Sequence, residues 1–405
     1  ITVHYKYSDK NKNDVKLEAV SYGGLSLIED ENLPSAKYAT TVVQQSGLGD
    51  YSATDLQKVV AGKTAETYIE ISELTESIYG VSVTKDVETM LQMVHLRFVK
   101  PRFDKDAYEV FKGQVDNYLI RRSEDVNEKI QDSVTVSLYG LNHPKKRLFN
   151  SDYGNDIKFE TIKKIYLERF ENASDFEFFI VGDLDVETLK PLLETYIASI
   201  PTKKNAEVWK DNSSEWLQNT IDKDVFIKME DPKSNVRISY KNKFGYNSKN
   251  NLLARTLADV LNLRYMERLR EEEGGTYGAS VYGNVTKRPT ETANLWIQFD
   301  CNPDKVEDLL KIVHSELESL SKGQISLEDL EKTKTNYLKE NKQQQDDSSY
   351  DMQRLKTFFR EGYYMNNPEN FETIVNGITK EDLSKFASQL LQNVQSYEIV
   401  IKPIQ

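Results

Sequence analysis

The feature that most limits what this chain can fold into is a weak internal repeat. The segment Val87–His95 matches Val306–His314 at an offset of 219 residues, and Asn117-Tyr118-Leu119 matches Asn336-Tyr337-Leu338 at the same offset. Two matches that share one offset indicate a duplicated unit, because unrelated coincidences would not preserve the spacing. The chain is therefore expected to contain two domains of the same fold.

Each half of the chain shows the same order of secondary-structure signals. Alternating or β-branched segments indicate strands, and apolar residues at helical spacing indicate helices. In the first half the expected elements are strand Asp14–Gly24, helix Pro34–Gln45, strands Thr67–Ser72 and Tyr79–Thr84, helix Asp86–Val99, one or two helices over Asp104–Leu138, helix Phe159–Phe170 and strand Phe176–Val181. In the second half they are strand Asn235–Lys243, helix Leu252–Leu269, strands Thr276–Val285 and Ala293–Cys301, helix Val306–Leu320, a long polar helical stretch Leu327–Phe359, helix Leu383–Leu391 and strand Tyr397–Ile401.

This order predicts an α+β fold with two homologous domains, each a mainly antiparallel sheet covered by helices on one face. A length of 405 residues agrees, since one hydrophobic core rarely serves more than roughly 300 residues. The first domain is expected over 1–205, including an additional amphipathic segment, Val186–Ile200. A connector rich in Lys, Asn and Ser follows over 206–230, with some strand of its own left open, and the second domain spans 231–405.

Charge and composition narrow the class of partner. The formal net charge is −12, so the chain repels phosphate backbones and a nucleic-acid partner is not expected. The acidity also suits cationic peptides, although solubility alone is the simpler explanation. Apolar stretches such as Phe178–Val181 are far too short for a membrane span. The single cysteine, Cys301, excludes an intramolecular disulfide.

Complete catalytic motifs are absent from the sequence. The four histidines are His4, His95, His143 and His314, and none has the spacing that puts two zinc ligands on one helical face. His95 and His314 occupy equivalent places in the repeat and are expected to be hydrogen-bonded histidines on a packing face. No dinucleotide loop, Walker loop, calcium loop or Gly-x-Ser-x-Gly elbow is complete either. The chain is therefore predicted to hold no metal and no catalytic residue of its own.

One segment, Met266–Val281, differs from the rest. A helix with a charged last turn ends at Gly274-Gly275, and a strand with Tyr277 near its beginning follows at once. Arg270 and Tyr277 are then two hydrogen-bond donors seven residues apart, which suit a substrate carbonyl that becomes an oxyanion. The alternative is that Arg270 pairs with a glutamate in Glu271–Glu273 and that Tyr277 packs.

These residues also resemble a known signature. Leu269-Arg270, followed by Glu273, Gly275 and Tyr277, resembles the Leu-Arg-x-x-x-x-x-x-Tyr signature of the pitrilysin/insulinase family of zinc metallopeptidases, the inverzincins. The preceding helix and several segments of the first half are similar to the family as well: Leu257, Leu261, Tyr265 and Leu269, then Ser21-Tyr22-Gly23-Gly24-Leu25-Ser26-Leu27, Ser46-Gly47-Leu48-Gly49 and Leu56-Gln57-Lys58. The resemblance covers nearly the whole chain and is strongest to the bacterial periplasmic branch.

The resemblance implies a division of labour between two halves that close around an unfolded peptide substrate. An N-terminal half holds zinc through an inverted His-x-x-Glu-His motif, and a C-terminal half contributes the arginine and the tyrosine. The matching stretch of the first repeat here, Tyr38–Val42, has neither ligand nor base, and the second repeat lacks the motif too. Zinc is therefore expected on a partner half or active subunit, and the resemblance favours the bacterial periplasm or cell envelope.

Three hypotheses follow from the sequence. In the first, the chain is the inactive C-terminal half or subunit of a zinc metalloendopeptidase, and Arg270 and Tyr277 bind the peptide substrate. In the second, it is a non-enzymatic scaffold or peptide-binding subunit of the same fold, against which the intact pair argues. In the third, it is an unrelated α+β binding module, which the repeat and the signature disfavour. A His-x-x-Glu-His motif encoded upstream of Ile1 or nearby would favour the first.

Overall fold

The chain forms two compact units, and each is assembled from three separate segments. The computed structural model describes residues 1–203, 207–230, 232–272, 276–362 and 368–404, without the side chains of 270–272, 277, 368 and 369. The first unit consists of Ile1–Ile120, Phe149–Asn212 and Lys342–Asn366, and the second of Arg121–Leu148, Ser213–Asn341 and Asn367–Gln405. The division at 1–205, 206–230 and 231–405 stays a prediction about the two repeats, because the compact units exchange segments between them.

The elements of the first unit are β1 (Thr2–Tyr7), β2 (Asp14–Tyr22), α1 (Leu33–Gln45), α2 (Ala53–Val59), β3 (Ala65–Ile71), β4 (Thr75–Val83), α3 (Val87–Val99), α4 (Lys105–Arg122), α6 (Ser151–Asn155), α7 (Phe159–Phe170), β5 (Glu177–Gly182), α8 (Val186–Tyr196) and α12 (Ser348–Glu361). Those of the second are α5 (Val126–Tyr139), β6 (Thr220–Ile227), β7 (Ser234–Lys243), α9 (Ser248–Tyr265), the π-helix Met266–Glu272, β8 (Thr276–Thr286), β9 (Thr292–Cys301), α10 (Val306–Ser321), α11 (Leu327–Gln344), α13 (Pro368–Asn376), α14 (Lys380–Leu391) and β10 (Gln395–Pro403). No helix in the described ranges is both long enough and apolar enough to cross a bilayer.

The two sheets have the same topology. The strand order is β1-β5-β2-β4-β3 in the first sheet and β6-β10-β7-β9-β8 in the second, so each strand has a counterpart in the other unit. Among the described strands, one pair in each sheet is parallel, β1 with β5 and β6 with β10, and the other pairs are antiparallel. The predicted fold class, two homologous domains with mainly antiparallel sheets, is confirmed.

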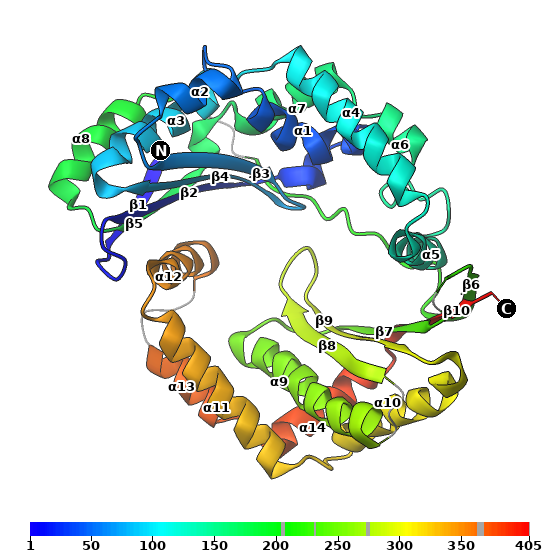
Figure 1. Cartoon of the computed structure of the whole chain (residues 1–405). Helices are drawn as coiled ribbons and strands as arrows, with labels where there is room; N and C mark the ends of the chain where they lie inside the picture. Colours follow the sequence, from blue (N-terminus) through cyan, green and yellow to red (C-terminus); the bar gives the residue numbers. More distant parts are fainter. Residues whose placement is uncertain (204–206, 231, 273–275, 363–367, 405) are drawn as a thin grey trace. The chain divides into compact units, whose positions relative to one another are not determined.

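One face of each sheet is covered by the helices of its own repeat, as predicted. In the first unit the core joins Leu17 of β2 and Ile78 of β4 to Met90 of α3. In the second it joins Ile238 of β7 to Leu257 of α9 and Leu309 of α10. Figure 1 shows α1, α3 and α7 over the first sheet and α9, α10 and α14 against the second.

The opposite face of each sheet carries a smaller apolar patch, and one further helix covers that patch. Successive residues of a strand point to opposite faces, so Val181 of β5 turns away from the helical layer that Ile180 joins. Val181 and Phe179 pack there against Met352 of α12. α12 lies on this face of the first sheet in Figure 1.

The second sheet is covered in the same way by α5. Ile399 of β10 faces away from the core that contains Val400, and it packs with Ile130 and Val134 of α5. α5 lies beside β6 and β10 in Figure 1. Each sheet therefore receives one helix from the half of the sequence that does not supply its strands.

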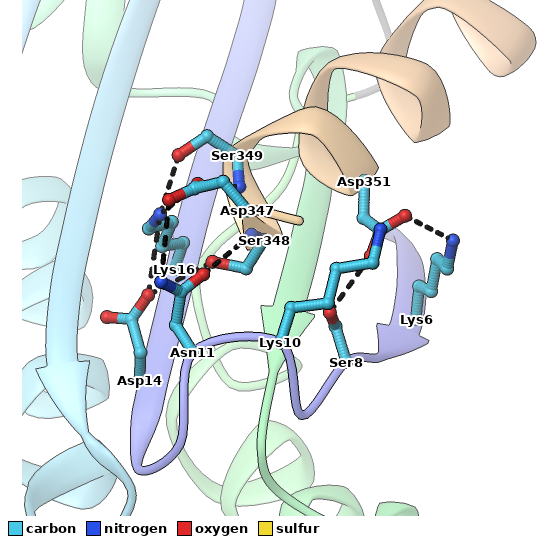
Figure 2. Close-up of polar contacts among 10 residues, drawn as sticks. All are labelled: Lys6, Ser8, Lys10, Asn11, Asp14, Lys16, Asp347, Ser348, Ser349 and Asp351. Atoms are coloured by element: carbon cyan, nitrogen blue, oxygen red, sulfur yellow. Dashed lines mark hydrogen bonds and ion pairs between the residues drawn. The ribbon is translucent and has the colours of Figure 1, made fainter. Parts of the chain in front are cut away.

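Polar contacts fix α12 on the first sheet (Figure 2). The buried carboxylate of Asp351 accepts hydrogen bonds from Lys6 Nζ at 2.6 Å and Ser8 Oγ at 2.9 Å, and it forms an ion pair with Lys10 at 3.0 Å. At the start of the helix Asp347 accepts a hydrogen bond from the Ser349 backbone N–H at 2.7 Å. This bond holds the pKa of Asp347 at about 2.

Three of the four described histidines make the following structural contacts. His95 Nδ1 lies 2.7 Å from the Tyr196 carbonyl oxygen, and His314 Nε2 lies 2.7 Å from a carboxylate oxygen of Glu398. The His4 ring stacks between Phe179 and Phe359, with centroid distances of 4.9 and 3.7 Å. In these three cases the ring is occupied by packing or by a protein hydrogen bond.

We predict that Asp351→Asn lowers the free energy of unfolding by about 1–3 kcal/mol, because it removes the charge from a buried acceptor with three partners. The loss should include faster hydrogen exchange in α12, measured alongside urea unfolding followed by circular dichroism. Asp55→Asn, which breaks an exposed ion pair with Lys58, is the matched control and should behave like the parent chain. Equal stability of both variants would show that these contacts do not hold α12.

A second prediction concerns pH. The hydrogen bond that His314 Nε2 donates to the Glu398 carboxylate raises the pKa of His314 above its ordinary value of 6.5, so the folded state binds this proton more tightly than the unfolded state. The resulting stabilisation is fully present below pH 6.5 and is lost as the pH rises through the folded-state value. Urea midpoints should therefore fall across this window, and Glu398→Gln should flatten the fall. Parallel pH curves for the two proteins would contradict the assignment.

Candidate functional site

The predicted site residues fall on two adjoining elements of the second unit. α9 continues into the π-helix Met266–Glu272, which includes Arg270, and β8 begins at Thr276 with Tyr277 as its second residue. The π-helix contacts both α9 and β8. The side chains of Arg270 and Tyr277 and the residues Gly274-Gly275 lie outside the described part of the structure. Whether Arg270 pairs with Glu271–Glu273 and whether Tyr277 packs therefore stay open predictions.

The wide turn that contains Arg270 is a departure from the expected α-helix. Single π-helical turns inside α-helices are rare and often occur at functional sites. On its core side Leu269 is fully buried, and Tyr265 Oη donates a hydrogen bond to the Val313 carbonyl oxygen at 2.9 Å. The turn is thus attached to α10 from the side that faces the core.

A β-bulge lies at the other half of the site. Between the pairs Thr276–Cys301 and Ala279–Phe299, β8 has one residue more than β9, and Tyr277 is in this interval. Gly278 has φ +147°, which side chains rarely adopt. The Thr276 hydroxyl donates to the Asp300 carbonyl oxygen at 2.5 Å and accepts from the Gly278 N–H at 3.2 Å. Bulges change the direction of side chains beside many active sites. This bulge determines the backbone conformation at Tyr277.

β8 is an edge strand, and α9 occupies part of that edge. Asn262 bonds to both backbone groups of Val281, donating to the carbonyl oxygen at 2.9 Å and accepting from the N–H at 2.8 Å. Asn251 accepts from the Val285 N–H at 3.0 Å. Among the described residues, α9 makes no such bond to Thr276–Ser280. The beginning of β8, next to Tyr277, is therefore the part of this edge that α9 does not cover.

Charged residues gather on the side of the turn that faces α10. The Glu316 carboxylate receives Arg264 Nη1 at 2.7 Å and Arg268 Nη1 at 2.5 Å. Arg264 Nη2 also donates to the Gln324 carbonyl oxygen at 2.9 Å. Sequence reasoning did not identify this group. The spacing of Arg264 and Arg268, four residues apart on one helical face, was the available signal, but their carboxylate comes from a helix about fifty residues later.

The described side chains do not fit a zinc ion. Within the described ranges, no group of three or more His, Cys, Asp or Glu side chains is arranged to hold a metal. The stretch Tyr38–Val42 lies in α1, where Ala39 and Val42 are buried in the core and Tyr38 packs beside Phe111 with a centroid distance of 5.4 Å. Apolar packing thus fills the place at which the resemblance would put the motif.

The single cysteine is an unsuitable nucleophile. Cys301 ends β9, and 5% of its surface is exposed. Burial, together with the charge of Asp300, raises the pKa of its thiol to about 11. The thiolate, which is the reactive form, is therefore scarce at neutral pH.

Residues 156–337 match the family described as Peptidase M16 inactive domain. The probable zinc protease PqqL of Haemophilus influenzae is 22% identical over 324 residues, which cover 79% of this chain and 34% of the relative. A PQQL-like zinc protease of Arabidopsis thaliana is 23% identical, over 81% of this chain and 33% of its own length. The chain thus spans about one third of the curated relatives that it matches.

Solved structures show the same fold. The ferredoxin protease FusC, in complex with Arabidopsis ferredoxin, superposes with a TM-score of 0.83 at 17% identity, covering 100% of this chain and 44% of that one. The periplasmic protease PqqL of Escherichia coli gives 0.80 at 19% identity, over 97% and 43%. A peptidase M16 inactive domain from Pseudomonas fluorescens gives 0.78 at 15% identity, over 100% and 95%.

The family match and the curated relatives agree with the resemblance seen in the Arg270 and Tyr277 signature. The solved structures add that the fold extends over the whole chain. The chain is homologous to the PqqL zinc proteases, its residues 156–337 match the Peptidase M16 inactive domain, and its fold is that of M16 family proteases.

Proposed function

We propose that this chain is the substrate-binding, zinc-free half of a zinc metalloendopeptidase and that Arg270 and Tyr277 stabilise the transition state of peptide hydrolysis. The observation that supports this most is the contact between the π-helix and β8, the elements to which the two residues belong. A guanidinium and a phenol from adjoining elements are suited to donate to one carbonyl oxygen as it gains negative charge.

The backbone around Tyr277 supports a peptide as the ligand. An extended peptide can pair with the free edge of a sheet through main-chain hydrogen bonds. Among the described residues, α9 makes no hydrogen bond to the backbone of Thr276–Ser280 at the start of β8, whereas Asn262 and Asn251 occupy the groups at Val281 and Val285. A substrate that pairs at Thr276–Ser280 would pass directly beside Tyr277.

Zinc belongs to the partner in this proposal. A zinc-binding half, on the same polypeptide or on an active subunit, supplies the metal that polarises the carbonyl and activates water. In the proposal this chain contributes binding and charge stabilisation, in line with the sequence, which has no zinc-ligand motif. The E. coli relative is described as a periplasmic protease, and we place this chain in the bacterial periplasm or cell envelope as part of the same proposal.

We predict that Arg270→Ala and Tyr277→Phe each lower kcat of the enzyme assembled with its zinc-binding half by roughly 10²–10³, because each removes one donor to the oxyanion. Initial rates on an unfolded peptide measure the effect, and circular dichroism checks the fold. Zinc content should match that of the parent enzyme, since the metal is held elsewhere.

Tyr282→Phe is the matched control for Tyr277→Phe. It makes the same chemical change five residues later on β8, in a ring that is 60% exposed and stacks on Trp296. Turnover of this control should equal that of the parent. Parental turnover in both Arg270→Ala and Tyr277→Phe would overturn the proposed role and favour a non-enzymatic scaffold or peptide-binding subunit.

A further inference from the structure

Glu316 of α10 is the buried centre of an ionic group beside the π-helix. Only 5% of the residue is exposed. One carboxylate oxygen accepts from Arg264 Nη1 at 2.7 Å and the other from Arg268 Nη1 at 2.5 Å. Hydrogen bonds between ionised partners are the strong ones, and a carboxylate shared by two guanidiniums fixes both.

The two arginines lie on either side of the point where α9 becomes a π-helix. Arg264 is in the last turn of α9 and Arg268 is in the wide turn itself, two residues before Arg270. Arg264 is also held by the Gln324 carbonyl oxygen at 2.9 Å and by the Asp329 carboxylate at 3.8 Å. The change of helical geometry is therefore attached to the corner between α10 and α11.

The core side of the same turn is held by apolar burial and by one hydrogen bond. Leu269 is fully buried, and Tyr265 Oη bonds to the Val313 carbonyl oxygen. These contacts fix the distance of the turn from α10 but contain no charge. The ionic contacts of Glu316 add a second line of attachment, which limits rotation of the turn about its own axis.

We propose that Glu316 is a positioning residue: through Arg264 and Arg268 it fixes the π-helical turn from which Arg270 acts. This inference rests on the proposed function of Arg270 and adds a residue that does not touch the substrate. An error of about 1 Å in the placement of a catalytic group can cost about a hundredfold in rate, so the attachment of this turn affects turnover more than substrate affinity.

Glu316→Gln and Glu316→Asp, made in the enzyme assembled with its zinc-binding half, test the proposal. The first removes the charge at constant shape, and the second keeps the charge but withdraws it by one methylene. We expect both to lower kcat by roughly 10–100-fold with KM unchanged. Backbone amides of 262–272 should exchange faster, while circular dichroism stays parental. If Glu316→Gln fails to fold, Glu316→Asp decides the question.

Glu318→Gln is the matched control, because Glu318 lies two residues away on α10 and pairs with Lys322 at the surface. Its kcat should equal that of the parent. The decisive comparison is the double variant with Arg270→Ala, in which loss of Glu316 should cost nothing further, since both act through one group. Parental kcat in the Glu316 variants overturns the positioning role. So does a Glu316 substitution that lowers kcat by the same factor whether Arg270 is present or replaced by alanine.

The same set separates this inference from the proposed function. If Arg270→Ala lowers kcat but the Glu316 variants do not, the positioning role fails and the proposed function stands. If Arg270→Ala leaves kcat at the parental value, the proposed function fails, and any effect of Glu316 is then structural, which overturns the inference as well.

Discussion

Each sheet of this protein has an apolar face covered by the helices of its own repeat and a second, smaller apolar patch on the opposite face, and the burial of that patch joins distant parts of the chain. One repeat supplies enough helices for one face only. The second face is covered by α12 on the first sheet and by α5 on the second, and each comes from the half of the sequence that does not supply the strands. Each compact unit of the structure therefore contains segments from both halves of the sequence. In the first sheet, burial of apolar side chains drives the docking of α12. The polar contacts of Asp351 then fix the position of α12 on the sheet.

The same architecture explains why the candidate site is in the second repeat. α9 reaches the edge of its sheet, where Gly283 lets the backbone of Ala254 approach β8 closely. α9 then continues as a π-helix. At this point Arg264 and Arg268 bond to Glu316 of α10, and Tyr265 bonds to the Val313 carbonyl oxygen. The corresponding helix of the first repeat, α1, ends as an ordinary helix, and Ala39 and Val42 along it are buried. The two repeats thus share their topology but differ at the end of this helix, where the sequence predicts the site in the second repeat.

Most of the fold could be predicted because strongly patterned elements, such as Val87–Val99 and Val306–Ser321, recur at one offset. β1 and β6 were not predicted as paired edge strands, since their parallel partners β5 and β10 lie more than 160 residues away in the chain. The break between α11 and α12 was missed because both helices are polar, although Asp347 caps the second. In the site, the motif identified Arg270 and Tyr277, but Glu316 depends on how two helices meet, which spacing alone does not reveal.

The asparagines of α9 have a further consequence for how the protein behaves in concentrated solution. An open sheet edge is a template onto which a second copy can add its own strand, and chains that do so aggregate. Here Asn262 and Asn251 occupy the outward groups of Val281 and Val285, so a foreign strand meets a partly closed border. The side chains of α9 thereby shorten the stretch of this edge that a strand from a second copy could pair with.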